Sequence, residues 1–239
     1  MTTENDAAWD SLTYEEKNRL LYERQKHMLD EFLEHGAISQ EQHDKSLHDL
    51  TEKMEIFDIA DENGQPTGTI ISREEAHQNG ILHRTAHVWL VKQKPGGFDI
   101  LLQKRSNDKD SFPGMYDTSS AGHIPAGDEP LKSALRELKE ELGLTASEED
   151  LQYAGTFRIQ YEKEFHRRMF RDNEVTRVYV YDKPVDIQDL SLQETEVSEV
   201  CWFDLEEVWN EIHQSRERFC VPTAGLKVLR EYLKGSELK

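Results

Sequence analysis

Cysteine is scarce in this chain, and long hydrophobic runs are absent. The two cysteines, Cys201 and Cys220, are too few for a disulfide framework or a Cys-based zinc site, so we interpret both as small buried apolar residues. Apolar runs such as residues 88–91 are far shorter than the roughly 20 residues of a membrane-spanning helix. Residues 1–6 lack the basic start and apolar segment of a signal peptide. These absences predict a cytoplasmic protein that does not span a membrane.

Basic side chains are also in deficit. The chain has 29 Lys and Arg against 48 Asp and Glu, a formal net charge of −19. Such a field repels nucleic-acid backbones and acidic membranes at long range, so we expect neither as a partner. Small anionic ligands remain compatible with this charge if divalent cations bridge them to carboxylates, because a bound ion dominates its local electrostatics.

The 239 residues are long enough for one domain of about 150–180 residues and an appendage. Hydrophobic residues (36%) and charged residues (32%) are interspersed, which excludes a disordered tail or a fibre. The sequence therefore predicts a globular chain with a substantial core.

Residues 1–54 differ in residue pattern from the rest of the chain, and this pattern predicts a helical hairpin. Capping boxes begin at Thr13 and at Ser39, and each precedes apolar residues spaced three and four apart, among them Leu21, Met28, Phe32, Leu47 and Leu50. Residues 1–55 hold 14 acidic and 6 basic side chains and no chemical motif. Because two helices cannot bury both apolar stripes alone, we expect the hairpin to pack on the main domain or on a second subunit, as in a homodimer.

Residues 55–239 are predicted to form the main domain, with short strands separated by turns and helices. A capping box at Ser72 opens a short helix that Gly80 ends, and two further helices follow Asp204 and Thr223. The best strand candidates are rich in branched and aromatic residues: 55–60, 83–92, 99–105, 151–159, 175–181 and 200–203. Trp89 and Trp202 are expected in the core.

One strongly amphipathic helix carries the most informative side chains. Asp128 is its expected N-cap and Gly143 its expected C-terminal stop. At about 100° per residue, Glu137, Glu140 and Glu141 share one arc beside the leucine stripe. Like charges at this spacing destabilise a helix unless cations hold them, and Mg²⁺ prefers such oxygen ligands.

This segment resembles the Nudix box of the Nudix hydrolase superfamily, Gly-x5-Glu-x7-Arg-Glu-apolar-x-Glu-Glu-x-Gly-apolar. Asp128 occupies the position where the motif usually has its first Glu, so the carboxylate is retained on a shorter side chain. Eight other positions match: Gly122, Arg136, Glu137, Leu138, Glu140, Glu141, Gly143 and Leu144.

The resemblance implies an α/β/α sandwich with a mixed sheet, preceded here by the N-terminal αα-hairpin. It also implies a small-molecule diphosphate substrate held with Mg²⁺ or Mn²⁺. If the roles of the family's motif residues are transferred position by position, the resemblance implies that Glu137, Glu140 and Glu141 are metal ligands. It also implies that Arg136 orients them. The general base varies within the superfamily, so Glu137, Glu140, Glu141 and Glu174 all stay candidates.

A narrower resemblance over about residues 56–205 is to the isopentenyl-diphosphate isomerase branch. It rests on runs such as residues 65–68, 82–84, 101–105, 112–116 and 172–175. It implies that Arg105 and Lys109 hold the diphosphate. It further implies a divalent metal held by three histidines and two acids, at the positions of His77, His83, His123, Asp172 and Glu174. The isomerase's catalytic cysteine is replaced by Ala121, which has no ionisable proton for isomerisation.

The sequence and its resemblances suggest three functions, of which the first is the most favoured. The first is a Mg²⁺-dependent pyrophosphohydrolase that acts on a diphosphate linkage, in a nucleoside diphosphate derivative. The second is an isopentenyl-diphosphate isomerase that uses another acid in place of cysteine, and the third is a non-catalytic ligand-binding or scaffold protein. His87 shares a strand face with His83 but matches no family position, so we expect it to be structural.

Overall fold

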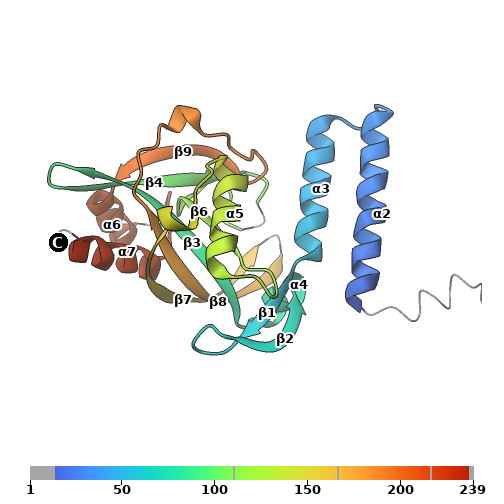
Figure 1. Ribbon diagram of the computed structural model, residues 1–239, viewed down its shortest axis with the longest axis horizontal. Helices are drawn as coiled ribbons and strands as arrows, with labels where there is room; N and C mark the ends of the chain where they lie inside the picture. The colour runs from blue at the N-terminus through green and yellow to red at the C-terminus, as the bar shows by residue number, and fades with distance from the viewer. Residues whose placement is uncertain (1–13, 110, 166, 216, 237–239) are drawn as a thin grey trace, which may run out of the picture. The chain divides into compact units, whose positions relative to one another are not determined.

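The computed structural model describes residues 14–109, 111–165, 167–215 and 217–236 (Figure 1). The chain divides into two compact units, one ending at Glu55 and one beginning at Ile56. No described helix is long and apolar enough to cross a membrane.

The N-terminal unit is a pair of helices, α2 (Tyr14–Glu34) and α3 (Gln40–Met54). The predicted capping box of α3 is present, because Ser39 Oγ accepts the Gln42 backbone N–H and Gln42 Oε1 accepts that of Ser39. Thr13 lies outside the described residues. Among the α2 side chains whose exposure the structure describes, the exposed large apolar ones are Leu20, Leu21, Met28 and Phe32.

The second unit is built on a mixed seven-stranded sheet whose central strand is β3 (His83–Lys94). One edge of β3 pairs in parallel with β8 (Arg168–Tyr181), which pairs antiparallel with β7 (Gln152–Phe165). The other edge pairs with two strands in succession, β6 (Ser120–His123) and then β4 (Gly97–Arg105). The sheet is completed by β9 (Val197–Asp204) and β5 (Tyr116–Asp117), both on β4.

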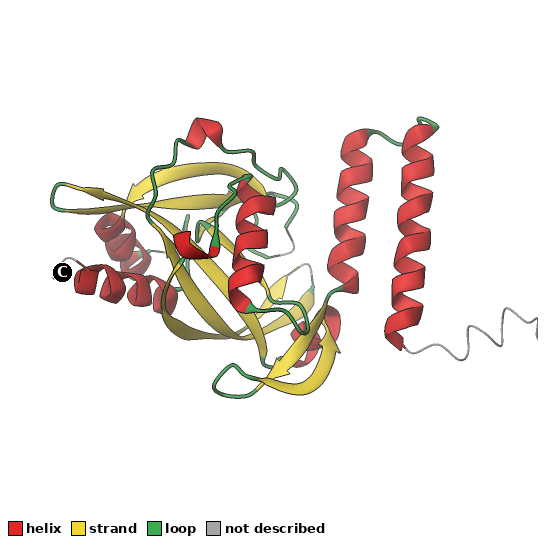
Figure 2. Ribbon diagram, in the orientation of Figure 1, coloured by secondary structure: helices red, strands yellow, loops and turns green. Residues whose placement is uncertain are grey.

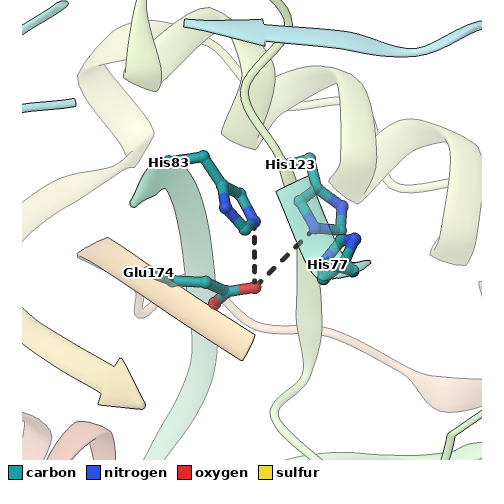
Figure 3. A group of neighbouring side chains, drawn as sticks. All are labelled: His77, His83, His123 and Glu174. Atoms are coloured by element: carbon teal, nitrogen blue, oxygen red, sulfur yellow. Dashed lines mark ion pairs between the residues drawn. The ribbon is translucent and has the colours of Figure 1, made fainter. Parts of the chain in front are cut away.

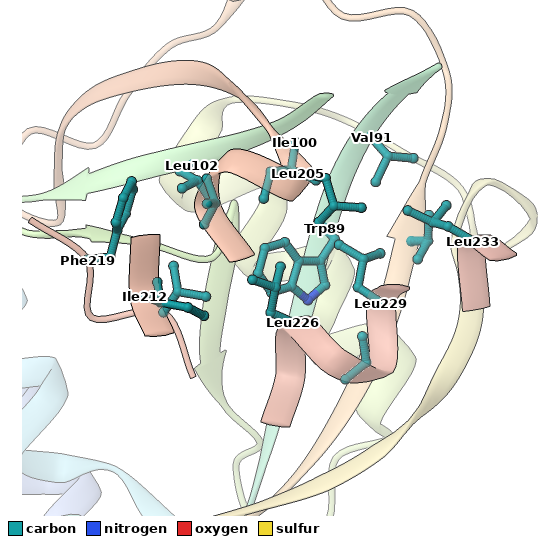
Figure 4. Packing of buried hydrophobic residues seen from close by; sticks show 14 of the residues in the cluster. Trp89, Val91, Ile100, Leu102, Leu205, Ile212, Phe219, Leu226, Leu229 and Leu233 are labelled. Atoms are coloured by element: carbon teal, nitrogen blue, oxygen red, sulfur yellow. The ribbon is translucent and has the colours of Figure 1, made fainter. Parts of the chain in front are cut away.

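Helices cover both faces of this sheet, with α5 (Pro130–Leu142) on one face and α6 (Leu205–Gln214) and α7 (Thr223–Ser236) on the other (Figure 2). Because strand side chains alternate, β3 sends Trp89 and Val91 to the α6/α7 core and Val88 and Leu90 to the α5 core (Figure 4). The predicted α/β/α sandwich with a mixed sheet is thus what the chain forms.

A small antiparallel sheet, β1 (Ile56–Ala60) and β2 (Pro66–Ser72), precedes the main one and leads into α4 (Arg73–Asn79). Ser72 caps α4 by accepting the Glu75 N–H, and Gly80 ends it with a φ of 65°. Buried Asp58 of β1 forms an ion pair with buried Arg84 (2.6 Å) and accepts the Gly127 N–H (2.9 Å). This contact fixes the loop that leads into α5.

Several predicted boundaries need correction. The helix α5 begins at Pro130 with Glu129 as N-cap, so Asp128 is not the cap. Strand β7 continues to Phe165 and β8 already begins at Arg168, and in these added lengths cross-strand pairing rather than apolar alternation forms the strands. Strands β2, β5 and β6 were not predicted, since β2 contains Pro and Gly and the other two are short.

Candidate active site

The short strand β6 brings the two groups of predicted site residues together. Its residues Ala121, Gly122 and His123 each touch a different part of the site. The Ala121 N–H donates to Glu141 Oε2 of α5 (3.2 Å), and the Glu137 carboxylate lies directly over Gly122. His123 points into a histidine cluster. A Cβ added at Gly122 would lie 2.2 Å from Glu137 Cδ, so this position must be glycine for Glu137 to lie where it does.

The three carboxylates of α5 have different surroundings. Glu141 is 4% exposed, the Glu137 side chain is 14% exposed, and the Glu140 side chain is 52% exposed. Arg136 ties two of them together, with Nη2 2.8 Å from Glu137 Oε1 and Nη1 2.9 Å from Glu140 Oε2. The arginine therefore links the side chains of Glu137 and Glu140 on α5.

Glu141 is the most perturbed carboxyl of this helix. Burial, together with the charges of Glu137 and Glu196, raises the pKa of Glu141 to about 8. The carboxyl group is then protonated near neutral pH when no cation is bound. A buried acid with a pKa near neutrality is suited to proton transfer and to binding a divalent cation.

A second cluster lies on the opposite face of the sheet from α5 and consists of His77 of α4, His83 of β3, His123 of β6 and Glu174 of β8 (Figure 3). One ligand atom from each of the four falls within 4.8 Å of the others. Glu174 Oε1 lies 3.8 Å from His83 Nε2 and 3.7 Å from His123 Nε2. Three regions of the sequence, around residues 77–83, 123 and 174, thus converge on one point.

Hydrogen bonds fix the orientation of this cluster. The ring Nδ1 atoms of His77 and His83 lie 3.0 Å from Arg73 O and 2.8 Å from Ile81 O, which leaves each Nε2 directed at the carboxylates. Thr85 Oγ1 donates to Glu174 Oε2 (3.0 Å). Such backbone and hydroxyl partners are typical of the groups that orient metal ligands.

The electrostatics of the cluster suit a cation. Burial lowers the pKa of His77 to about 3 and that of His83 to about 4, and it lowers the pKa of His123 well below its usual value. The imidazoles are therefore neutral, which is the form that binds metals. His83 Nε2 and His123 Nε2 are buried and have no hydrogen-bond partner, which fits a divalent ion.

Asp172 lies beside this cluster rather than within it. Its Oδ1 is 3.9 Å from His77 Nε2 and is buried without a hydrogen-bond partner. Burial raises the pKa of Asp172 to about 6 and raises that of Glu174 strongly, with a further rise from the charge of Asp172. The structure therefore brings all five predicted histidine and acid positions into one neighbourhood.

Arg105 and Lys109, predicted to hold the diphosphate, both contact acids in this structure. Arg105 Nη1 is 3.4 Å from Asp117 Oδ2 and its Nε donates to Ser111 O, while Lys109 Nζ is 2.6 Å from Glu196 Oε2. Their charges are nevertheless felt within the site, because Lys109 lowers the pKa of both His123 and Glu141.

Arg73, the first residue of α4, is a charged neighbour of the site that no motif in the sequence indicated. After the larger effect of burial, its positive charge lowers the pKa of His77, His83 and His123, and it also lowers that of Glu174. Arg73 precedes His77 by four residues on one helix, a spacing that places both on the same face. That spacing was the available signal.

Neither cysteine is a buried apolar residue, contrary to the prediction. Both are free thiols of intermediate exposure. Cys201 Sγ donates to Glu199 Oε1 (3.1 Å) and Cys220 Sγ to Tyr116 O (3.4 Å). His87 is buried, with its ring against Phe157 and its Nδ1 3.4 Å from Thr118 Oγ1.

A cavity of about 390 Å³ lies apart from the predicted site residues. It is lined in part by Asp58, Arg84, Arg177 and Tyr179 together with the start of α5. None of the predicted catalytic, substrate-binding or metal-ligating residues lines this cavity.

Comparison with known proteins identifies the family of this chain. Residues 81–221 match the NUDIX domain family, and the chain belongs to that family. It is 37% identical over 154 residues to an uncharacterized Nudix hydrolase of Clostridium acetobutylicum, covering 64% of this chain and 72% of that protein. It is 40% identical over 158 residues to Nudix hydrolase 3 of Arabidopsis thaliana, covering 65% of this chain but only 20% of that protein's length.

Isomerases are also among the relatives. The chain is 29% identical over 149 residues to the isopentenyl-diphosphate Delta-isomerase of Dinoroseobacter shibae, covering 62% of this chain and 79% of that one. The solved structure of DR0079 from Deinococcus radiodurans matches with a TM-score of 0.55 at 17% identity, over 74% of this chain and 98% of that one. That likeness supports the fold alone.

Proposed function

We propose that this protein is a Mg²⁺- or Mn²⁺-dependent hydrolase of a diphosphate linkage, in a nucleoside diphosphate derivative. The observation that carries the proposal is the arrangement around β6. Glu141 accepts the Ala121 N–H, Glu137 covers Gly122, and the next residue, His123, belongs to the histidine and Glu174 cluster. One four-residue strand thus joins the Nudix-box acids to a set of neutral imidazoles.

The residues present suit divalent ions in chemical type. Glu137, Glu140 and Glu141 are hard oxygen ligands suited to Mg²⁺, and His77, His83, His123 and Glu174 would hold an ion such as Mn²⁺. When bound, a divalent ion supplies Lewis acidity toward the diphosphate and toward water. The buried Nε2 atoms of His83 and His123, which lack partners, support this assignment.

The chain's own residues then have separate roles in hydrolysis. Arg136 holds the carboxylates of Glu137 and Glu140 in position through its two Nη atoms. Among the four candidates for the general base, Glu141 and Glu174 have raised pKa values because they are buried. A carboxylate that accepts the proton of the attacking water works best with a pKa near neutrality, and the pKa of Glu141, about 8, lies close to it. Arg105, Lys109 and Arg73 would attract the anionic substrate.

The proposal is tested by ³¹P NMR of the purified protein with Mg²⁺ and a panel of nucleoside diphosphates, ADP-ribose, dinucleoside polyphosphates and isopentenyl diphosphate. We expect new phosphorus resonances that disappear with EDTA and in Glu140→Gln. Glu129→Gln is the matched control, because Glu129 is an exposed acid at the start of the same helix. Retained turnover in Glu140→Gln would remove the metal assignment at α5.

Isopentenyl-diphosphate isomerisation is the second candidate. It is favoured by the five histidine and acid positions that come together, and by the similarity to isomerases. Against it, Ala121 stands at the position of the catalytic cysteine and has no proton to transfer. The NMR panel separates the two, since an isomerase converts isopentenyl into dimethylallyl diphosphate without cleaving the phosphoanhydride bond.

A further inference from the structure

Four half-buried aromatic rings lie together beside the histidine cluster, and the hydrolytic roles above do not use them. They are Phe112, in the loop between β4 and β5, and Tyr161, Phe165 and Phe170 of the β7–β8 hairpin. Ring centroids within this cluster are 5.1–6.3 Å apart. Aromatic rings that stay partly accessible next to a polar site are typical of ligand recognition.

This aromatic cluster is joined directly to His77 of the histidine cluster and to Asp172 beside it. Phe170 stacks on His77, with ring centroids 4.4 Å apart and planes at 20°. The Tyr161 hydroxyl is hydrogen-bonded to the Asp172 carboxylate, and Tyr161 pairs with Asp172 across the hairpin. The rings therefore begin at the cluster and extend away from it, from Phe170 to Phe165 and on to Phe112.

A cation covers the outer end of the aromatic cluster. Lys163 Nζ lies 4.3 Å from the Phe112 ring centroid and 5.1 Å from that of Phe165. Phe112 has a φ of 49°, a left-handed conformation that bulky residues rarely adopt. Such a conformation persists only where the surroundings hold it, and here three side chains of the hairpin contact the Phe112 ring.

We propose that Phe112, Tyr161, Phe165, Phe170 and Lys163 form the subsite for the planar base of a nucleoside diphosphate, whose diphosphate lies at the histidine cluster. The proposal rests on the proposed function for the position of the diphosphate. The cluster offers ring faces for stacking and a cation for the acceptor atoms of a base. Three successive ring contacts lead from His77 through Phe170 and Phe165 to Phe112, so the cluster presents several rings beside the histidine cluster.

The test measures binding rather than turnover. Calorimetry with Mg²⁺ compares α,β-methylene-ADP with methylenediphosphonate, two hydrolysis-resistant ligands that differ by the nucleoside. We expect the wild type to bind the nucleotide at least tenfold more tightly. Phe165→Leu and Phe112→Leu should weaken nucleotide binding roughly five- to a hundredfold, the range for removing one base-stacking ring. Binding of methylenediphosphonate should stay within twofold.

Two controls distinguish stacking from general damage. Phe165→Tyr keeps the ring and should retain nucleotide affinity. Tyr153→Leu removes an exposed ring of the same strand that contacts Tyr179 instead, and it should change neither affinity. Equal losses for both ligands, or no loss in either leucine variant, would overturn the proposal.

The outcomes also separate this proposal from the proposed function. If the protein prefers the nucleotide but hydrolyses nothing in the NMR panel, the base subsite stands and the hydrolase assignment is wrong. If the protein hydrolyses the substrate but does not prefer the nucleotide in the binding test, only the base-subsite proposal is wrong. A gain in affinity for isopentenyl diphosphate over methylenediphosphonate that disappears in Phe165→Leu would assign the cluster to an isoprenoid chain and overturn the base.

Discussion

Replacing Gly122 by alanine is the sharpest test of how β6 positions the Nudix-box acids. The new Cβ would lie 2.2 Å from Glu137 Cδ and 2.3 Å from Glu137 Oε1. Non-bonded carbons pack at about 3.5 Å, so the Glu137 carboxyl must move by about 1.3 Å. Because these atoms are the far end of a flexible side chain, the carboxyl can move without unfolding the strand.

The expected result is a large loss of activity with little loss of stability. A displacement of about 1 Å in a positioned catalytic group costs on the order of 100-fold in rate. Gly122 does not have the positive φ that only glycine tolerates, and alanine suits a strand better by roughly 0.5–1 kcal/mol, which offsets part of the strain. The free energy of unfolding should therefore change by less than about 2 kcal/mol.

The assay combines turnover rates followed by ³¹P NMR with urea unfolding. Gly97→Ala is the matched control, since a Cβ there meets nothing within 4 Å and the residue lies in β4 of the same sheet. If Gly122→Ala keeps its rate within threefold of the wild type, then the position of Glu137 over β6 does not matter to the chemistry and our reasoning about the site is wrong.

Three further predictions concern the site and its support. The pKa of Glu141 is raised to about 8 from an ordinary 4.5, so the metal-free protein should lose stability as the pH rises through this window. Binding of Mg²⁺ at pH 7 must then displace the proton of Glu141. Calorimetry in buffers of different ionisation heat should detect release of that proton in the wild type and a smaller release in Glu141→Gln. Thr85→Val removes the hydrogen bond to Glu174 and should lower Mn²⁺ affinity about 10- to 100-fold in an EPR titration, and unchanged affinity would argue against a metal at Glu174. Asp58→Ala leaves the Arg84 charge buried and should cost about 3–5 kcal/mol in urea unfolding, whereas Asp99→Ala, at a more exposed pair, should cost under about 1 kcal/mol.

Much of this protein is determined locally by its sequence. The helix α5 ends at Gly143 because glycine adopts the left-handed conformation there, and Leu138 and Leu142 are fully buried because they lie on the apolar face. The spacing of Arg136, Glu137, Glu140 and Glu141 places their side chains on one arc for the same helical reason. These features required no knowledge of distant contacts, so the sequence was sufficient to predict them.

The tertiary structure decided what no local pattern contains. The convergence of His77, His83, His123 and Glu174 depends on the parallel pairing of β3 with β8 and on β6 lying against β3. The long β7–β8 hairpin is held by cross-strand pairing, and its aromatic residues meet Phe112 from a loop about 50 residues earlier. Burial lowers the histidine pKa values and raises those of Glu141 and Glu174, and burial exists only once the chain has folded. The sequence alone therefore determined which groups are available, and long-range packing decided which of them meet and in which protonation state.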